Sequence, residues 1–500
     1  MQPLIPTSKQ LVRSSVTGVI CSIINAVVLF IVYPIYIYKL GTEIFGVWVM
    51  IGVLIGWSQI GSLGIPQAVM KFVAGSAAKG DKEGLIEYIS SALTVIIFSG
   101  SIILLILLLI RGTIGNVLHV PLTIKLNIPF YILFAGVIVV VSFLAQTINS
   151  ILSGIGRMDL ANINDIIGKL VGSVISVIFI YKGYGISGLL IGSISECLII
   201  LFIALTSSIM ILRFVPYKIN MIKITRIRET IFFGGTLAVG SLLAMFIEPF
   251  NRFVLGQYVG LSTATVYDVS SRAVVQTRGI LEAGFRSFVP QSSTYYIKGH
   301  IIKLREMSKL SVRFICFLGV PILLVLIIWA PELISMWLKI EMPNMSYAIR
   351  IMAFSYIFSL MVSPAYYLFM GIGKKEICFR VYFIFSILNL FLVFLIMLLG
   401  FINLKWVVNI FALSLIISSL YLMRASYREF GERYFADIKN MIFILLSMVC
   451  ILFFKFVGLY FNYQNIIAIL LIISSILTYL VICHVGKLIP LSYLKSHNII

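Results

Sequence analysis

Five charged side chains crowd into one stretch of an otherwise apolar chain, from Thr265 to Pro290. They are Asp268, Arg272, Arg278, Glu282 and Arg286. Arginine suits a diphosphate, because its planar guanidinium stays charged and donates two parallel hydrogen bonds. At about 100° per residue, Asp268, Arg272 and Arg286 fall on one stripe, while apolar side chains fall on the opposite side. The stretch therefore predicts an amphipathic helix with a basic face suited to an anion.

The rest of the chain has the composition of a membrane protein. Of its 500 residues, 61% are hydrophobic and 11% are charged. Several apolar runs reach the ~20 residues that cross a bilayer as a helix, and a transmembrane barrel would show short alternating segments instead. The six cysteines and four histidines are scattered, without the spacing of a metal site or a disulfide framework. We therefore expect an all-α polytopic membrane protein with no metal and no cofactor.

Fourteen membrane spans are expected, and the basic residues orient them. Their approximate bounds are 13–38, 45–70, 86–110, 128–152, 162–181, 186–209, 230–255, 262–290, 309–331, 346–370, 377–400, 403–424, 440–457 and 464–485. With the N-terminus in the cytoplasm, 25 lysines and arginines fall in cytoplasmic segments and 8 in outer segments. This is the bias of the positive-inside rule, so both termini are expected in the cytoplasm. The net charge of +20 then needs no nucleic-acid partner.

The charged stretch is expected to be one of these spans, because without it every later basic loop would change sides. A central arginine facing lipid would cost at least ~3 kcal/mol, so the polar stripe must face protein or a water-filled cavity. Charged residues inside spans are functional candidates by default. We expect substrate binding at four arginines within spans. They are Arg252, Arg272, Arg278 and Arg286.

Carboxylates lie four residues from these arginines, where helical side chains meet. The expected pairs are Glu248–Arg252, Asp268–Arg272, Arg278–Glu282 and Glu282–Arg286. Two interpretations stay open: either the pairs are permanent supports, or each arginine turns to substrate while its carboxylate takes up a proton or Na⁺. The ion-coupling candidates are Glu248, Asp268, Glu282 and Glu196. We interpret Glu196 as a lone carboxylate in mid-span, and we expect Lys169 to extend toward the membrane interface.

Short sequence matches recur in the same order in the two halves of the chain. Pro34 with Leu40-Gly41 recurs as Pro249 with Leu255-Gly256, Pro66-Gln67 as Pro290-Gln291, and Gly154-Ile155-Gly156-Arg157 as Gly371-Ile372-Gly373-Lys374. The repeating unit holds six spans, an even number, so both copies point the same way through the membrane. We expect two parallel six-helix lobes, 1–210 and 211–425, followed by two additional helices in 426–500. Parallel repeats of this kind are typical of transporters, with the substrate path between the lobes.

This plan of six, six and two spans, with a Gly-Ile-Gly-Arg/Lys turn in each lobe, resembles the MOP exporter superfamily. Within it, the chain is most similar to the Wzx-type flippases of bacterial surface polysaccharides. The resemblance implies transfer of an undecaprenyl-diphosphate-linked oligosaccharide, such as an O-antigen repeat unit of lipopolysaccharide, from the cytoplasmic to the periplasmic leaflet of the inner membrane. It further implies a cationic lumen. From the competition between substrate and carboxylate for the arginines, we expect alternating access of the two lobes to be coupled to proton or Na⁺ antiport. The expected state is a monomer, with the polymerase and chain-length proteins of the same pathway as partners.

Four other functions were weighed against this one. A multidrug exporter of the same fold would need a lumen rich in carboxylates and aromatic rings, whereas arginines outnumber acids on the charged helix. A peptidoglycan lipid flippase would share both the diphosphate and the fourteen spans, so it stays open. A polysaccharide polymerase or ligase would carry a large outer loop, and the expected outer loops do not exceed about twenty residues. Charges buried in spans disfavour a scaffold without transport, and we expect no enzymatic activity.

Overall fold

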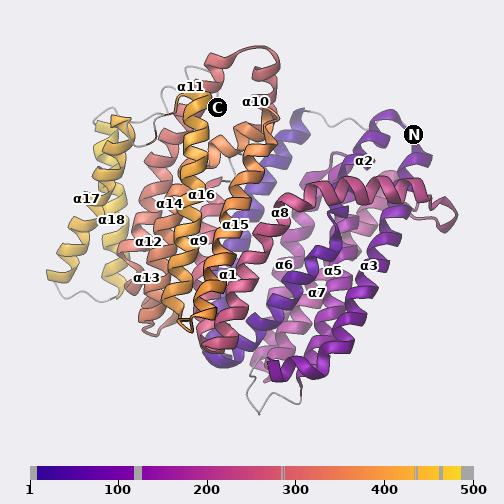
Figure 1. Ribbon diagram of the computed structural model, residues 1–500, viewed down its shortest axis with the longest axis horizontal. Coiled ribbons are helices and arrows are strands. Elements are labelled where there is room, and N and C mark those ends of the chain that lie inside the picture. The colour runs from indigo at the N-terminus through magenta and orange to yellow at the C-terminus, as the bar shows by residue number, and fades with distance from the viewer. Residues whose placement is uncertain are drawn as a thin grey trace. The chain divides into compact units, whose positions relative to one another are not determined.

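The chain is all-helical where its computed structural model describes it (Figure 1). The described residues are 8–117, 127–282, 285, 288–432, 434, 437–460 and 465–485. They form two compact units, Met1–Thr265 and Val266–Ile500, which we call unit 1 and unit 2. Eleven described helices are long and apolar enough to cross a membrane, and the first, Val16–Lys79, covers two of the expected spans. The predicted all-α polytopic fold is confirmed, while the count of fourteen spans stays a prediction.

Unit 1 is a bundle built around α5. In chain order it contains α1 (Ser8–Ser58), η1 (Gln59–Ser62), α2 (Ile65–Lys79), α3 (Lys82–Val117), α5 (Ile128–Gly154), α6 (Met158–Tyr181), α7 (Ile186–Leu212), η2 (Ile219–Met221) and α8 (Ile224–Tyr258). α5 packs on α2, α3 and α7, and α6 packs on α7 and α1. Buried Val69, Ile89 and Phe143 belong to the apolar core among α2, α3 and α5.

Unit 2 repeats this packing. It contains most of α9 (Leu261–Glu282), then α10 (Phe288–Ile297), α11 (Ile301–Phe314), the π-helical turn η4 (Ile315–Gly319), α12 (Val320–Ile328), α13 (Ala330–Leu338), α14 (Pro343–Gly371), α15 (Lys375–Leu398), α16 (Leu404–Phe430), α17 (Ile438–Tyr460) and α18 (Asn465–Val485). α14 packs on α10, α12 and α16, as α5 packs on α2, α3 and α7 (Figure 1). α15 packs on α16 as α6 packs on α7.

The expected lobe boundaries, at 210 and 425, stay a prediction. α8 packs on α1, α2 and α3, so it lies within compact unit 1. The connection before α8 is tied to α3 as well, because Lys218 N donates to Ser90 Oγ over 2.9 Å and Lys223 N donates to Ser91 Oγ over 3.2 Å. The first helix of the second sequence repeat is therefore part of the unit that the first repeat forms.

The two Gly-Ile-Gly turns have the same geometry, which supports the sequence repeat. Gly156 and Gly373 have φ of +80° and +82°, in the left-handed region that glycine enters without steric cost. In each turn the next residue closes a hydrogen bond back to its helix. Arg157 N donates to Leu152 O over 2.8 Å, and Lys374 N donates to Phe369 O over 3.0 Å. Both helices thus end in a glycine cap of the Schellman type, followed at once by the next helix.

The first glycine of each turn permits a close helix contact. A Cβ on Gly154 would lie 2.9 Å from the carbonyl oxygen of Met70 on α2. A Cβ on Gly371 would lie 1.9 Å from Ser292 Oγ and 2.4 Å from the carbonyl oxygen of Val289, both on α10. Because no Cβ fits, α5 approaches α2, and α14 approaches α10, more closely than other residues would allow.

The predicted span 262–290 is wrong in length. α9 ends at Glu282, and a separate helix, α10, begins at Phe288. Pro290 lies in the first turn of α10, where proline is tolerated because the first N–H groups of a helix have no intrahelical partner.

The two C-terminal helices are attached to unit 2 at several depths. The hydroxyl of Tyr479 on α18 donates to the carbonyl oxygen of Phe317 over 2.9 Å. Phe317 belongs to the π-helical turn, where the usual backbone pairing is shifted. Lys455 on α17 pairs with Glu332 on α13, and both side chains are largely buried. Polar contacts therefore reinforce the apolar packing of this pair of helices.

Alanine at Gly371 should destabilise the protein by about 1–3 kcal/mol, because its Cβ would overlap Ser292 and Val289 on α10. The measurement is the thermal unfolding midpoint of the purified protein in detergent. Gly75→Ala is the matched control, because Gly75 lies in α2 and no atom of a neighbouring element comes within 4 Å of its Cβ position. Equal midpoints for the two variants would contradict the close approach of α14 and α10.

Candidate functional site

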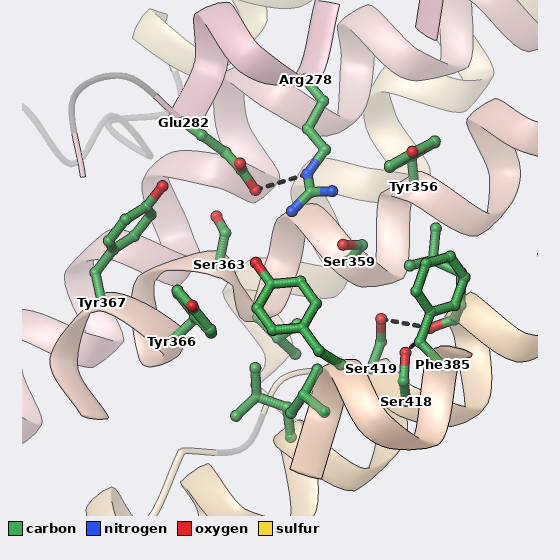
Figure 2. Close-up of a pocket in the computed structure, with 15 residues that line it drawn as sticks. Arg278, Glu282, Tyr356, Ser359, Ser363, Tyr366, Tyr367, Phe385, Ser418 and Ser419 are labelled. Atoms are coloured by element: carbon green, nitrogen blue, oxygen red, sulfur yellow. Dashed lines mark hydrogen bonds and ion pairs between the residues drawn. The ribbon is translucent and has the colours of Figure 1, made fainter. Parts of the chain in front are cut away.

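A polar pocket in unit 2 has an ion pair from α9 on one side. Arg278 and Glu282 stand one helical turn apart, and Nε of Arg278 donates to Oε1 of Glu282 over 2.8 Å. Their side chains are 28% and 14% exposed. The cavity beside them measures about 110 Å³, and the two other guanidinium nitrogens point into it (Figure 2). The expected i,i+4 pair therefore forms, and it faces a cavity rather than a packed interface.

Three candidate membrane spans, α14, α15 and α16, supply the other walls of this pocket. Tyr356, Phe385 and Ser418 each lie within about two residues of the midpoint of their helix. At a rise of about 1.5 Å per residue, this places the pocket near half depth of all three helices. A guanidinium at such a depth needs a carboxylate and a polar surround, because apolar surroundings would leave its charge without solvation.

Serine hydroxyls cover much of the wall opposite Arg278. They belong to Ser359, Ser363, Ser418 and Ser419, which are all buried (Figure 2). Ser363 donates to the Leu360 carbonyl over 2.9 Å, and Ser418 and Ser419 donate to the Leu415 carbonyl over 2.9 and 2.7 Å. Because each of these three donors is used within its own helix, the oxygen lone pairs are what these serines offer to the cavity.

Aromatic rings complete the pocket. The Arg278 guanidinium lies 5.3 Å from the ring centre of Tyr356, within the range of a cation–π contact. The rings of Tyr366 and Tyr382 meet edge to face at 5.7 Å, and those of Tyr366 and Tyr367 at 5.6 Å. Together with Phe385, these rings give the pocket apolar surfaces next to polar edges.

Two further charged pairs that the sequence predicts, one on α9 and one on α8, also form. On α9, Nε of Arg272 donates to both carboxylate oxygens of Asp268, over 2.9 and 3.0 Å, and the Asp268 side chain is only 2% exposed. On α8 in unit 1, Arg252 donates to Glu248 over 2.6 Å. Arg286, and with it the expected Glu282–Arg286 pair, lies outside the described residues.

Two interpretations of unit 1 need correction. Glu196 is not a lone carboxylate, because Nζ of Lys169 lies 3.3 Å from its Oε2. Lys169 likewise turns to α7 rather than extending to the membrane interface. Neighbouring helices α6 and α7 bring the two side chains together across 27 positions of sequence, which no spacing rule within one helix detects. Asp165, one turn before Lys169, accepts instead from Asn149 on α5 over 3.0 Å.

The tyrosines and serines of α14, α15 and α16 were not among the site residues expected from the sequence. A usable signal was present on α14, where Ser355, Ser359 and Ser363 recur every four residues within an apolar span. Residues four apart share one face of a helix, so this pattern predicts a polar stripe. The sequence does not specify, however, which helices this stripe faces. That depends on the packing of α14 against α16 and on the position of α9 across the pocket.

A second crevice, of about 460 Å³, lies between α11, which begins the candidate span Ile301–Ile328, and the residues that follow α16, including Glu432 and Asp437. Burial, reinforced by the nearby carboxylate of Asp437, raises the pKa of Glu432 to about 7. Burial also acts on Asp437, but the hydrogen bond from Arg313, at 2.9 Å, prevails and lowers the pKa of this carboxyl. The acidic and basic side chains here neutralise one another's charge. Because Lys309 and Arg313 on α11 pair with Asp437 just before α17, we interpret the cluster as an attachment of α17 rather than as a ligand site.

Comparison with known families assigns the chain to one of them. Residues 39–341, more than half of the chain, match the family described as "Polysaccharide biosynthesis protein". The chain belongs to this family. A relative of this polysaccharide biosynthesis protein is described as "Putative O-antigen transporter", from Shigella flexneri. It is 20% identical over 347 residues, which cover 68% of this chain and 79% of the relative.

Solved structures share the fold of this polysaccharide biosynthesis protein. The lipid II flippase MurJ, in an inward closed conformation, aligns over 96% of this chain and 99% of its own, with a TM-score of 0.63 and 16% identity. An inward-facing multidrug resistance MATE transporter of the MOP superfamily aligns over 82% and 94%, with a TM-score of 0.63 and 13% identity. The family match and the O-antigen transporter relative support the expected kinship with the flippases of surface polysaccharides, and the solved structures share the expected fold. The candidate spans make the chain a multi-pass membrane protein, and its fold is the one seen in these flippase and transporter structures.

Removing one charge of the pocket pair should cost more than removing both. Arg278→Met leaves the Glu282 carboxylate largely buried without its cation, which should destabilise the protein by about 1–3 kcal/mol. The double variant Arg278→Met/Glu282→Met removes both charges, so part of the loss should be recovered. Thermal unfolding in detergent measures both. Lys298→Met, at an exposed position, is the control, and additive losses in the double variant would argue against a coupled pair.

Proposed function

We propose that this protein is a flippase for an undecaprenyl-diphosphate-linked oligosaccharide, such as an O-antigen repeat unit. It would move the headgroup from the cytoplasmic to the periplasmic leaflet of the bacterial inner membrane by alternating access of its two lobes. The lipid tail stays in the bilayer, whereas the diphosphate and the sugars need a polar path. Both termini would lie in the cytoplasm, as the distribution of basic residues favours.

One observation carries this proposal: an arginine faces a polar cavity at half depth of three candidate membrane spans. Arg278 holds its charge there beside Glu282 and is surrounded by hydroxyl groups and aromatic rings. Placing a charge at such a depth is costly, so it is retained where it serves a ligand or an ion. In a family of polysaccharide biosynthesis proteins, the matching ligand is the anionic headgroup of a lipid-linked saccharide.

The arginines would act on the diphosphate as hydrogen-bond donors with a permanent charge. Arg272 and Arg278 are the proposed direct contacts, six residues and therefore about 9 Å apart along α9. Arg252 and Arg286 would extend the path. In the described structure Arg252, Arg272 and Arg278 are each paired with a carboxylate, so substrate would compete with that carboxylate for the same guanidinium.

The relatives favour a saccharide cargo over a drug. The names of the Shigella flexneri relative and of MurJ refer to O-antigen and lipid II, respectively. The MurJ structure covers 96% of this chain and the MATE structure 82%. A peptidoglycan lipid flippase is therefore the second candidate function. It would use the same arginines, because the diphosphate is common to both lipids.

Transport in proteoliposomes tests the function directly. Wild-type protein should move a fluorescent undecaprenyl-diphosphate oligosaccharide between leaflets, and Arg272→Ala or Arg278→Ala should reduce the rate at least tenfold, because each removes a charged hydrogen bond to the phosphates. Arg228→Ala, at an exposed position near the start of α8, is the matched control. A cationic dye serves as the competing cargo. If only the dye moves, the protein is a drug exporter and the arginines are structural partners of their carboxylates.

Ion coupling would follow from the same competition. When Arg278 turns to substrate, Glu282 loses its cation and becomes a site for a proton or Na⁺. Release of substrate would reverse this, so that ion and substrate move in opposite directions. Asp268 and Glu248 are placed to do the same beside Arg272 and Arg252. Glu196 is the fourth candidate, with Lys169 as the competing cation.

A gradient experiment tests this coupling. An imposed proton or Na⁺ gradient should accelerate wild-type transport, and Glu282→Gln should lose that acceleration, because an amide does not take up a proton and has no negative charge to hold Na⁺ in place of the arginine. Glu306→Gln, at an exposed position on α11, is the control and should keep it. Wild-type transport that is indifferent to both gradients would rule out the antiport mechanism while leaving the flippase function intact.

A further inference from the structure

We propose that the pocket beside Arg278 binds one sugar ring of the lipid-linked substrate, the ring attached to the diphosphate. This inference rests on the proposed flippase function and adds a saccharide subsite to it. The pocket lies entirely within unit 2, among α9, α14, α15 and α16. It would let the protein distinguish a sugar-bearing lipid from the bare lipid diphosphate.

The distribution of charge in the pocket separates two binding regions. Among the fifteen described residues that line it, the two charged ones are Arg278 and Glu282, both on α9. They neutralise one another at 2.8 Å. The walls from α14, α15 and α16 are uncharged, so they suit a neutral ligand rather than a second phosphate. The diphosphate therefore belongs beside the α9 helix, and the uncharged region beyond it suits the group that follows.

The polar groups of those walls match the hydroxyls of a sugar. Three serine hydroxyls donate to carbonyls of their own helices, so their oxygens are available to accept hydrogen bonds from a ligand. They are those of Ser363, Ser418 and Ser419. Tyr366 and Tyr367 bring phenol groups, which both donate and accept. A ring with several hydroxyls has donors and acceptors around its edge, and it therefore uses both kinds of partner.

The aromatic rings match the remaining surface of a sugar. A pyranose presents C–H groups on its faces and hydroxyls at its rim, so it is apolar in one direction and polar in the other. Tyr356, Phe385 and Tyr366 supply apolar ring surface in the same pocket that the serines make polar (Figure 2). Pockets that combine aromatic walls with a few placed polar groups fix the orientation of a ligand.

The size of the pocket suits a single ring. Its volume is about 110 Å³, which exceeds the space of a few water molecules and is below the roughly 300–1,000 Å³ of sites for drug-sized ligands. A complete oligosaccharide repeat does not fit. The subsite would thus recognise the first sugar, while the others stay outside this pocket.

Binding of defined lipids to the full-length protein in nanodiscs tests the subsite. The probes are undecaprenyl diphosphate and the same lipid carrying a single glucose, galactose or N-acetylglucosamine. The wild type should bind at least one sugar-bearing probe fivefold or more tightly than the bare diphosphate. Ser363→Ala and Tyr366→Phe should each lower the affinity for that probe about two- to tenfold, the worth of one hydrogen bond, and leave the affinity for the bare diphosphate unchanged.

Two further variants separate the subsite from the flippase function. Arg278→Ala should weaken binding of all four lipids, because it removes the proposed phosphate contact. Tyr427→Phe, which is 52% exposed on α16, should change none of them. If the bare diphosphate binds but no sugar improves its affinity, or if the pocket variants keep the preference, the subsite is refuted and the flippase function stands. If no lipid binds, the proposed function fails, and the subsite fails with it.

Discussion

A charged side chain inside an apolar layer needs polar or oppositely charged groups around it in place of water. This constraint governs the described structure. Arg278 lies at half depth of three candidate membrane spans, and it is accompanied there by Glu282, Tyr356 and serine hydroxyls. The same rule holds in unit 1, where Lys169 and Glu196 join α6 to α7. Each of these charges therefore requires a partner of opposite sign, on the same helix for Arg278 and on the neighbouring helix for Lys169.

Close helix packing makes such polar sites possible. Gly154 and Gly371 let α5 and α14 approach α2 and α10 almost backbone to backbone, which leaves the other faces of the long central helices free for larger groups. In unit 2 the free faces of α14 and α16 carry the serines and tyrosines of the pocket. The two units thus share the same helix packing, which reflects the internal repeat, but they differ in the polar side chains that their central helices carry.

The sequence was sufficient to predict features that depend on neighbours within one helix. The pairs Asp268–Arg272 and Arg278–Glu282 follow from a spacing of four, and the two Gly-Ile-Gly turns follow from the repeat. Features that depend on contacts between helices were not predicted. The partner of Glu196 is 27 residues away, the pocket joins helices separated by about 140 residues, and the break before α10 was missed because the apolar pattern continues past Glu282.

The π-helical turn Ile315–Gly319 carries a consequence for the evolution of this fold. Such a turn holds one residue more than the α-helix that would replace it, so everything beyond it is rotated by about 100° around the helix axis. Pro321, four residues after Phe317, has no N–H to donate, so the main-chain carbonyl of Phe317 lacks its usual α-helical donor and accepts from the hydroxyl of Tyr479. The last helix is thus held both through the backbone of Phe317 and through its ring, which lies 5.9 Å from the ring of Tyr479. Loss of a single codon there would rotate α12 relative to α11 and, in the same event, displace the carbonyl that accepts from Tyr479.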